Sequence, residues 1–424
     1  MNENTGVKIM LITRRPKGTE DLIPQDSYKW QYLEKNFKEI CDNFGYKEIR
    51  VPTFEHTELF ERGVGDTTDV VEKQMYTFND KGGRSVTLRP EGTASVARSY
   101  LENNLYAGVL PLKMWYNVPC FRYENKQKGR LREFHQFGIE AFGSKGPEID
   151  AEVVTLAITF LNKVGLTDLS VNINSIGCPE CRKKYSEALR DYLRPKYDEF
   201  CDTCKGRFER NPLRILDCKS EICQDLAKGA PTLLDYICDE CREHFESFKK
   251  ALSNMGVEYK VDSGIVRGLD YYTKTVFEII SGPFTVCGGG RYDGLVEEFG
   301  GERTPAIGFG LGIERLLIRL QENGVEIPDE GKPDIYIAPL GDNAKEVAQT
   351  VTFSLRKEGI KAETDLMGRG LKPQMKYSDK LGAKYTLVLG DSEIETGDIR
   401  LKNMETGEQT EWKLDNIVNF FKNN

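Results

Sequence analysis

The stretch IPDEGKP at residues 327–333 separates two regions with different patterns, and this change constrains the fold more than any other feature of the sequence. Before it, strand-like segments are joined by hairpin signals, which is typical of an antiparallel sheet. After it, strand-like and helix-like segments alternate over roughly 90 residues, which predicts a separate α/β domain. We therefore place an N-terminal extension at 1–13, a first domain at 14–325, a linker at 326–332 and a second domain at 333–424.

Eight of the eleven cysteines lie between residues 178 and 241, as CPEC, CDTC, DCKSEIC and CDEC. The segment 178–250 has a mostly helical pattern and is expected to be an insertion in the first domain. Repeated C-x-x-C in a chain without an export signal favours metal over disulfides. One arrangement joins the first pair with the last, and the second pair with Cys218 and Cys223; another joins the first two pairs. Structural zinc and ordinary reduced cysteines are the two interpretations, and neither includes a catalytic metal.

The segment FRYENKQKGRLREFHQFGIE, residues 121–140, predicts two strands around a basic loop. Side chains two positions apart on a strand share a face. Phe134, Gln136 and Glu140 therefore share one face of the return strand, and Gly138 leaves a gap between them. An aromatic ring, an amide and a carboxylate around a gap are typical of a small-molecule pocket. The alternative is a solvated sheet face.

Two other stretches place polar groups beside expected helices. In GFGLGIER (308–315), glycines lead into a helix beginning near Glu314, with Arg315 in its first turn. A cation is mildly unfavourable at this positive end of a helix, so we expect a bound anion there. In LRPEGTASVAR, Glu91 and Thr93 can together hold an ammonium group, although Thr93 also suits an N-cap. The glycine spacings match neither a P-loop nor a dinucleotide fingerprint.

The segment RGLDYYTKTVFE, residues 267–278, cannot be a regular strand throughout. Alternation sends Tyr271 and Tyr272 to opposite faces, and it also separates Arg267 from Tyr272. We therefore expect a turn or bulge at 267–270, with the regular strand starting near Tyr272.

These stretches resemble the motifs of class II aminoacyl-tRNA synthetases. FGYKEIRVPTFEHTELF resembles motif 1, FRYE with EFHQFGIEAFG resembles motif 2, and AIGFGLGIERL resembles motif 3. TLRPEGTA and RGLDYYTKTVFE narrow the resemblance to the histidyl-tRNA synthetase family, from about residue 14 to the C-terminus. The cysteine-rich part of 178–250 is its least typical portion.

The resemblance implies an α+β protein. It would contain an antiparallel class II catalytic sheet with flanking helices, a mainly helical insertion, and a C-terminal α/β anticodon-binding domain. It also implies a homodimer built partly on motif 1. The expected activity is ATP-dependent ligation of L-histidine to tRNA(His), in protein synthesis, through a histidyl-adenylate.

The resemblance assigns a histidine-binding role to part of the site. Glu91, Thr93 and Gln136 would hold the amino end of L-histidine. Glu140 and Tyr272 would hydrogen-bond the imidazole nitrogens, which would reject other amino acids without editing. Tyr271 would border the pocket or point to the other side of its strand. The residues expected to bind histidine are Glu91, Thr93, Gln136, Glu140, Tyr271 and Tyr272.

The resemblance assigns the remaining site residues to ATP and to catalysis. Arg122 would bind the α-phosphate, Glu124 the adenine amino group and Phe134 the adenine face. Arg315 would bind the terminal phosphate, and Mg²⁺ would accompany the pyrophosphate. Arg267 would lie opposite Arg122, so that both stabilise charge as the histidine carboxylate attacks the α-phosphorus.

Two other functions remain open at this level. A catalytically inactive relative of this family regulates ATP phosphoribosyltransferase; such a chain should lack the anticodon domain and have degraded motifs. A class II synthetase for another amino acid, such as threonine or proline, would have a similar C-terminal domain, but RGLDYY with Glu140 fits imidazole better.

Charge and hydropathy bear on partners and location. The formal net charge of −8 argues weakly against a dedicated nucleic-acid binder. Local segments differ: 356–384 carries eight basic against four acidic residues, and 122–135 carries five against two. Each is either a solvated surface or a contact for a polyanion such as tRNA. No long apolar run or secretory signal is present, so we expect a cytoplasmic protein with no membrane span.

Overall fold

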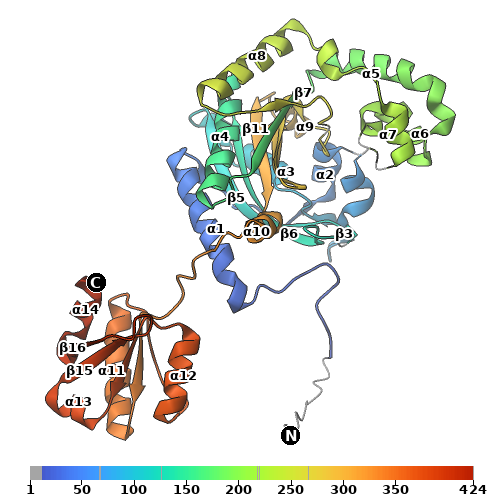
Figure 1. Cartoon of the computed structure of the whole chain (residues 1–424). Coiled ribbons are helices and arrows are strands. Elements are labelled where there is room, and N and C mark those ends of the chain that lie inside the picture. The colour runs from blue at the N-terminus through green and yellow to red at the C-terminus, as the bar shows by residue number, and fades with distance from the viewer. Residues whose placement is uncertain are drawn as a thin grey trace. The chain divides into compact units, whose positions relative to one another are not determined.

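The computed structural model describes residues 12–65, 68–125, 127–216, 218, 220–265 and 267–423. The chain forms two compact units that divide between Ile327 and Pro328 (Figure 1). Residues 1–11 of the expected N-terminal extension, and Lys126 of the basic loop, lie outside the described residues. In the part of the chain that is described, no helix has the length and apolar character needed to cross a membrane.

An eight-stranded sheet forms the centre of the first unit, in the order β1-β5-β6-β11-β10-β9-β7-β8. Each of the six middle strands is antiparallel to the middle strands beside it. At the edges, β1 runs parallel to β5 and β8 runs parallel to β7. The expected antiparallel sheet is confirmed. The strands are β1 (Lys47–Glu48), β5 (Leu112–Phe121), β6 (Glu133–Phe142), β7 (Leu169–Ser175), β8 (Lys260–Val261), β9 (Thr273–Ser281), β10 (Phe284–Arg291) and β11 (Ala306–Gly312).

The first unit also contains a separate three-stranded antiparallel sheet, with the strand order β2-β4-β3. It contains β2 (Phe54–His56) and a hairpin formed by β3 (Tyr76–Asn79) and β4 (Ser85–Leu88). The segment after Tyr46 forms two strands in different sheets, because β1 ends before Pro52 and β2 begins after it. Proline has no amide N–H for a sheet ladder, so it ends the pairing at this point.

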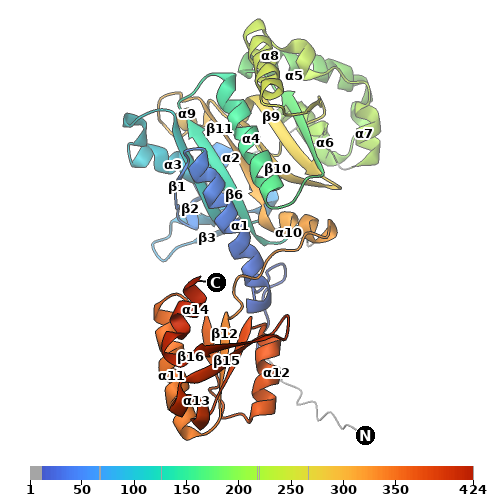
Figure 2. The ribbon, with the colours of Figure 1, turned by 60° about the vertical axis from the view of Figure 1, so that its left-hand side comes forward.

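Helices α1 (Pro24–Asn43) and α4 (Pro147–Lys163) pack together over one face of the large sheet (Figure 2). Apolar side chains at alternate positions of the strands face them, including Phe137 and Ile139 of β6, which belong to the same buried core as α1 and α4. The other alternate positions therefore face the opposite side. The remaining helices that support this part of the unit are α2 (Thr57–Val64), the π-helix η1 (Val70–Gln74), α3 (Thr93–Glu102), the 3₁₀ helix η2 (Leu105–Ala107), α9 (Leu295–Glu298) and α10 (Ile313–Glu322).

The cysteine-rich segment is mainly helical, as expected, and projects from one side of the first unit (Figure 1). Its last helix packs against α4, and Phe245 and Phe248 join the core beneath the sheet. The insertion is therefore attached to the rest of the first unit along a helix as well as at its two ends. Its elements are α5 (Pro179–Leu193), η3 (Arg194–Glu199), α6 (Asp202–Arg210), η4 (Pro212–Ile215), α7 (Glu221–Ala227), η5 (Leu233–Tyr236) and α8 (Asp239–Asn254).

The second unit is an α/β domain around a five-stranded sheet, in the order β13-β12-β14-β15-β16. Strands β13 and β14 run parallel to β12, and the last two strands form an antiparallel hairpin. Its elements are β12 (Ile335–Pro339), α11 (Asp342–Lys357), β13 (Ala362–Thr364), α12 (Leu371–Leu381), β14 (Tyr385–Leu389), α13 (Asp391–Thr396), β15 (Asp398–Asn403), β16 (Gln409–Lys413), η6 (Leu414–Asn416) and α14 (Ile417–Asn423).

Candidate active site

One cavity lies on the face of the large sheet that α1 and α4 leave open. Its volume is about 390 Å³, which is in the range of small-molecule sites. Strands β6, β9, β10 and β11 supply its sheet side, and the segments before α3 and β9 supply its rim. Ten of the predicted site residues line it: Glu91, Thr93, Arg122, Glu124, Phe134, Gln136, Arg267, Tyr271, Tyr272 and Arg315.

The open space predicted over Gly138 is absent, and that prediction is wrong. Tyr116 pairs with Gly138 across β5 and β6. An added Cβ on Gly138 would lie 2.2 Å from the tyrosine ring, so only glycine accommodates the ring here. Tyr116 lines the cavity in its place, while Phe134 and Gln136 still face the cavity from β6.

Glu140, the remaining predicted residue, is fully buried beneath the cavity and does not line it. Its Oε1 accepts hydrogen bonds from the hydroxyls of Thr93 at 2.7 Å and Tyr116 at 3.0 Å, and its Oε2 accepts one from Tyr292. Burial raises the pKa of Glu140 to about 8 despite these donors. Gly308 on the neighbouring strand leaves room for the carboxylate, because a Cβ there would collide with Oε2.

Glu91 caps helix α3, a role that the sequence suggested for Thr93. Its two carboxylate oxygens accept the backbone N–H groups of Thr93 at 2.7 Å and Ala94 at 2.8 Å. Thr93 is the first helical residue, and its hydroxyl donates to Glu140 instead of capping the helix. The negative charge of Glu91 at the helix N-terminus is favourable, and its side chain still lines the cavity.

Four arginines line the cavity, namely the predicted Arg122, Arg267 and Arg315 and, in addition, Arg130 of the basic loop. Arg122 donates from Nε to the carbonyl of Pro90 at 2.8 Å, and its guanidinium lies 5.4 Å from the Phe134 ring centre. Arg315 donates from Nε to the carbonyl of Gly129 and from Nη1 to that of Thr285, both at 3.1 Å. Burial and the nearby Arg130 lower the pKa of Arg315. Positive charges gathered in this way are typical of an anion site.

Arg267, the third predicted arginine, is held beside strands β9 and β10. Its Nη1 contacts the carboxylate of Glu278 at 2.5 Å, and its guanidinium lies 5.6 Å from the Tyr272 ring centre. Its Nε is buried without a hydrogen-bond partner among the residues that the structure describes. An added Cβ on Gly288 would lie 2.5 Å from Arg267, so this glycine leaves the space that the guanidinium occupies.

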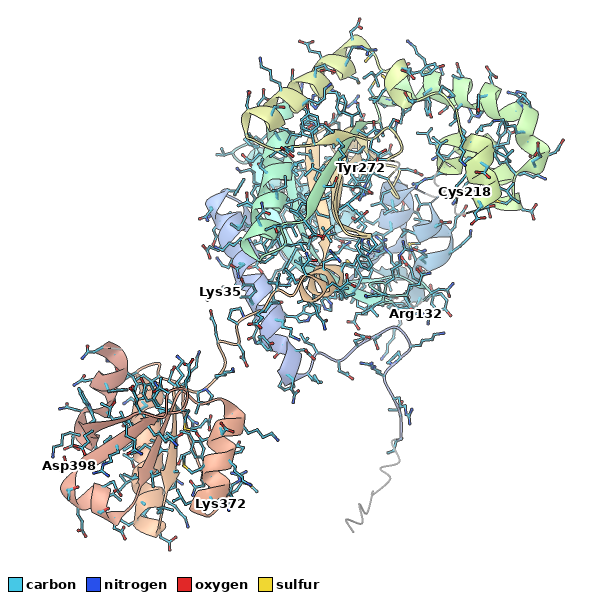
Figure 3. The ribbon with its side chains drawn as sticks, in the orientation of Figure 1. Lys35, Arg132, Cys218, Tyr272, Lys372 and Asp398 are labelled. Carbon is cyan, nitrogen blue, oxygen red and sulfur yellow. The ribbon has the colours of Figure 1, made fainter. Side chains whose placement is uncertain are left out.

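The bend expected at 267–270 is confirmed. Residues 268–271 are bend and turn, and strand β9 begins at Thr273. Because neither tyrosine belongs to the strand, alternation does not separate them. Tyr271 and Tyr272 both line the cavity, with ring centres 4.7 Å apart, and the Tyr271 hydroxyl lies 3.5 Å from Glu91 Oε2. Figure 3 shows Tyr272 inside the first unit.

Sequence reasoning missed three side chains at this site: Tyr116, Tyr292 and Glu278. Glu278 is a charged residue within the otherwise largely apolar segment TVFEII, and this pattern could have identified it as a candidate site residue. Tyr116 lies on β5 and Tyr292 directly follows β10, and their contacts with Glu140 depend on how those strands are ordered in the sheet. No local pattern reveals that order.

The sequence profile of the histidyl-tRNA synthetase family matches residues 18–316, and that of the anticodon-binding domain matches residues 334–424. The histidine–tRNA ligase of Acetivibrio thermocellus is 58% identical over 416 residues, which cover 97% of this chain and 100% of that protein. The chain belongs to the histidyl-tRNA synthetase family. The histidine–tRNA ligase of Clostridium perfringens is also 58% identical, over 96% of this chain and 99% of that protein. The apo histidyl-tRNA synthetase of S. aureus is 42% identical with a TM-score of 0.84, covering 97% of this chain and 100% of that one.

The histidyl-tRNA synthetase interpretation is favoured over the regulatory alternative. That alternative predicted a chain without an anticodon domain and with degraded motifs. Residues 334–424 instead match the anticodon-binding family, and Arg122, Arg267 and Arg315 all line one cavity.

The insertion of this family member brings its cysteines together in two groups. The inner cluster contains Cys178, Cys181, Cys238 and Cys241, and the outer cluster contains Cys201, Cys204, Cys218 and Cys223. This is the first of the two arrangements considered from the sequence. The sulfurs of each cluster lie within 4.8 Å of one another. Four thiolates around one zinc ion stand roughly 3.8 Å apart for bonds of about 2.3 Å, so both clusters fit a tetrahedral metal.

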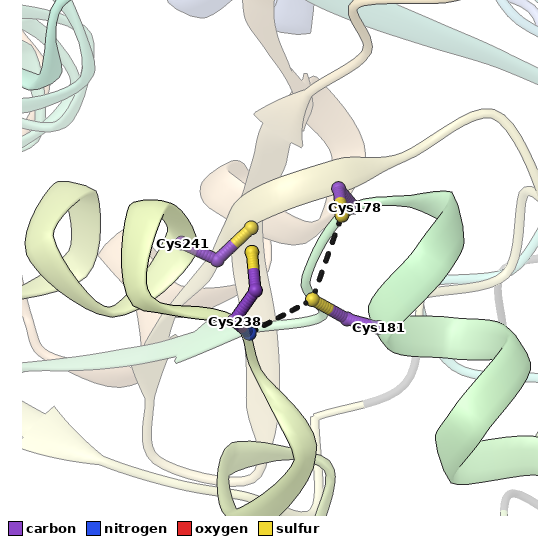
Figure 4. Close-up of side chains that lie close together, drawn as sticks. All are labelled: Cys178, Cys181, Cys238 and Cys241. Carbon is purple, nitrogen blue, oxygen red and sulfur yellow. Dashed lines mark hydrogen bonds between the residues drawn. The ribbon is translucent and has the colours of Figure 1, made fainter.

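The inner cluster lies where the insertion leaves and re-enters the catalytic core (Figure 4). Cys178 and Cys181 begin helix α5, and Cys238 and Cys241 begin helix α8. The Sγ atoms of the first pair are 3.5 Å apart, and the backbone N–H of Cys238 donates to Cys181 Sγ at 3.1 Å.

We expect the stability of the free protein to depend on pH through Glu140. Between the ordinary value near 4.5 and about 8, the folded chain holds a proton that the unfolded chain has released. Raising the pH through this window therefore destabilises the folded state, by at most about 1.4 kcal/mol per pH unit. Glu140→Gln should remove this contribution. Thermal unfolding of both proteins without histidine at pH 5.5–7.5 tests this prediction. As the pH rises, the unfolding midpoint of the wild type should fall relative to that of the variant. The same pH dependence of the midpoint in both proteins would contradict the prediction.

Proposed function

We propose that this chain ligates L-histidine to tRNA(His) in two steps. ATP first activates the histidine carboxylate as histidyl-adenylate, and the histidyl group then passes to the terminal 3′-hydroxyl of the tRNA. One observation carries the proposal: a single cavity joins four arginines, several aromatic rings and several carboxylates. Those are the groups needed to hold ATP and an amino acid against each other.

The histidine side of the cavity is built from charges and hydroxyls. Glu91 and Thr93 lie together at the start of α3, and with Gln136 they are suited to the α-ammonium group. Glu140 and Tyr272 are assigned to the imidazole. When histidine binds and Glu140 is ionised, its Oε1 accepts two hydrogen bonds and its Oε2 accepts one from the described residues, which leaves one acceptor position for an imidazole N–H. Tyr271 borders the pocket through its contact with Glu91.

The ATP side of the cavity lies toward β6 and α10. Phe134 supplies a ring for the adenine, and Glu124 is assigned to its amino group. Arg122 is assigned to the α-phosphate and Arg315 to the terminal phosphate. Arg122 is steadied by Pro90 and Arg315 by Gly129 and Thr285, so their charges are fixed before ATP arrives.

Mg²⁺ is expected with ATP, because it prefers carboxylate, phosphate and water oxygens. Glu278 would offer its Oε2, because its carboxylate lines the cavity while Oε1 is paired with Arg267. The hydroxyl of Thr285 donates to the same Oε2 at 3.2 Å. The ion would neutralise charge on the departing pyrophosphate.

The first step is an in-line attack on phosphorus. A histidine carboxylate oxygen forms a bond to the α-phosphorus while the bond to the bridging oxygen breaks, and pyrophosphate leaves with the electron pair. Negative charge grows on the equatorial oxygens, where Arg122 and Arg267 are assigned to stabilise it. In the second step the tRNA 3′-hydroxyl attacks the histidyl carbonyl and AMP leaves.

Amino-acid-dependent ATP–pyrophosphate exchange tests the proposed reaction and separates it from the alternatives. With the twenty standard amino acids tried one at a time, we expect exchange with histidine and at most about 10⁻⁴ of that rate with any other, because unsatisfied imidazole partners would remain. Exchange with threonine or proline would assign a different substrate, and no exchange with any amino acid would support a regulatory role.

The tRNA partner is proposed to contact the second unit, whose sequence matches the anticodon-binding family. Lys372, Lys376 and Lys380 are exposed and spaced by four along α12, so they lie along one side of that helix. Figure 3 shows Lys372 pointing outward from it. This helix carries part of the basic stretch 356–384 and is suited to a phosphate backbone.

A homodimer is proposed on the segment that resembles motif 1. Phe54 in that segment is exposed, as are Val109 and Leu110 after helix α3. Exposed apolar side chains of this size are typical of protein interfaces, and molar mass in solution tests the dimer.

The cytoplasm is the proposed location, because ATP, histidine and tRNA meet there.

Both cysteine clusters are proposed to bind structural zinc. Their sulfurs already lie at distances that suit tetrahedral coordination. We expect two zinc ions per purified chain, and one each in Cys178→Ser/Cys181→Ser and Cys201→Ser/Cys204→Ser, measured by elemental analysis. Less than about half an equivalent in the wild type would show that the cysteines are reduced thiols without metal.

A further inference from the structure

The loop that carries Arg267 is held from behind by the insertion. Arg214, in η4, donates from Nη1 to the backbone carbonyl of Arg267 at 2.9 Å and from Nη2 to Asp270 Oδ1 at 2.6 Å. Its side chain is only 7% exposed. Asn211 donates to the same oxygen of Asp270 at 3.3 Å. One guanidinium therefore joins both ends of the bend at 267–270, in a geometry that a lysine cannot reproduce.

Part of the back of this loop faces a cavity, although Leu269 packs against the buried core of the insertion. A second cavity of about 310 Å³ lies between the loop and the insertion, and Arg214, Arg267, Leu269 and Asp270 are among its lining residues. Because interiors resist movement through close packing, a loop backed by a cavity depends on its hydrogen bonds for its position. Arg214 supplies two of those bonds.

The segment that carries Arg214 is enclosed by the outer cluster. Cys204 lies in α6 before it, and Cys218 follows η4. Phe208 and Ile215 are buried beside them, and this core continues through the insertion to Tyr272 and Val276. The outer cluster and the segment that follows the arginine loop therefore share one core. A metal in the outer cluster would fix the ends of the segment and hence the position of Arg214. Figure 3 shows Cys218 in this outlying part of the unit.

We propose that the outer cluster is a zinc site that positions the catalytic arginine loop, with Arg214 as the positioning residue between the metal and Arg267. This inference rests on the proposed role of Arg267 in histidine activation. Zinc in the outer cluster would then have two roles. It would stabilise the fold of the insertion, and its occupancy would set the rate of adenylate formation.

The test uses the full-length protein and compares Arg214→Ala with Arg210→Ala. Arg210 is a matched control, because it lies in the same segment, is exposed, and pairs with Glu72 rather than with the loop. For Arg214→Ala we expect kcat of histidine-dependent pyrophosphate exchange to fall about 10- to 100-fold, the effect of displacing a catalytic group by roughly 1 Å. KM for histidine and ATP should change less than about threefold, and two zinc ions should remain bound. Arg214→Lys should recover part of the loss, and Arg210→Ala should behave as wild type.

The metal is tested with Cys201→Ser/Cys204→Ser, which should lose one zinc ion and show a similar fall in kcat. Adding Arg214→Ala to it should cause little further loss, because both changes break one connection. Any of three results would overturn the proposal. The first is an unchanged kcat in Arg214→Ala, and the second is a fall in kcat/KM for Arg210→Ala as large as that for Arg214→Ala. The third is a loss of kcat in the combined variant equal to the product of the two separate losses. If the cysteine variant does not fold, Arg214→Ala alone decides, since it leaves every thiol in place. Failure of the proposed function is distinguishable, because the wild type would then show no histidine-dependent exchange.

Discussion

Arg267→Ala is expected to reduce histidine-dependent ATP–pyrophosphate exchange by about 10³-fold, the upper range for removing one preorganised donor from a transition state. Arg267 lines the active-site cavity, and its ion pair with Glu278 holds the guanidinium there, so its positive charge is in place before substrates bind. The loss should fall mainly on kcat, because charge on the α-phosphate oxygens grows only as the reaction proceeds.

A matched control separates this effect from a general loss of positive charge. Arg303 is exposed in the same unit, and Arg303→Ala should retain exchange close to that of the wild type. Arg267→Ala should also unfold cooperatively near the wild-type temperature, because its partner Glu278 keeps the hydroxyl of Thr285 as a donor. Near-normal exchange in a folded Arg267→Ala protein would remove Arg267 from the mechanism.

The parts of the site that sequence could predict are those that depend on strand period and turn chemistry. Phe134 and Gln136 share a face because they are two positions apart on one strand, and both line the cavity. The bend before β9 follows from a conflict: Arg267 and Tyr272 cannot both face one way on a regular strand. The boundary between the two units follows from a change of pattern that needs no tertiary information.

The parts that sequence could not predict depend on which strands become neighbours. The sequence of β6 predicts open space above Gly138, because glycine has no side chain. Tyr116 of the adjacent strand occupies that space. Glu140 and Glu91 both read as cavity-facing carboxylates. Only the packing of α3 shows that Glu91 caps a helix and that Glu140 lies beneath three hydroxyls. The bond from Arg214 to the arginine loop joins positions 53 residues apart, and no periodicity links them.

Glu140→Gln should raise KM for histidine by about 100-fold or more while leaving KM for ATP within about threefold, because hydrogen bonds to charged groups are worth roughly 1.5–3 kcal/mol and an unpaired buried group adds to that. The change is isosteric, so the space beside Gly308 is preserved. Its amide has one acceptor oxygen where the carboxylate has two. The hydroxyls of Thr93, Tyr116 and Tyr292 must then compete for that oxygen, and the amide nitrogen presents a donor toward the imidazole or toward a hydroxyl.

Steady-state exchange at varied histidine and fixed, saturating ATP measures this effect. Glu243→Gln, an exposed change of the same chemistry on α8, should leave both constants unchanged. An unaltered KM for histidine in Glu140→Gln would mean that the imidazole does not reach this carboxylate, and that Glu140 serves only to bind the hydroxyls around it. A raised KM together with the loss of the pH-dependent stability would instead tie both effects to one buried proton-binding group.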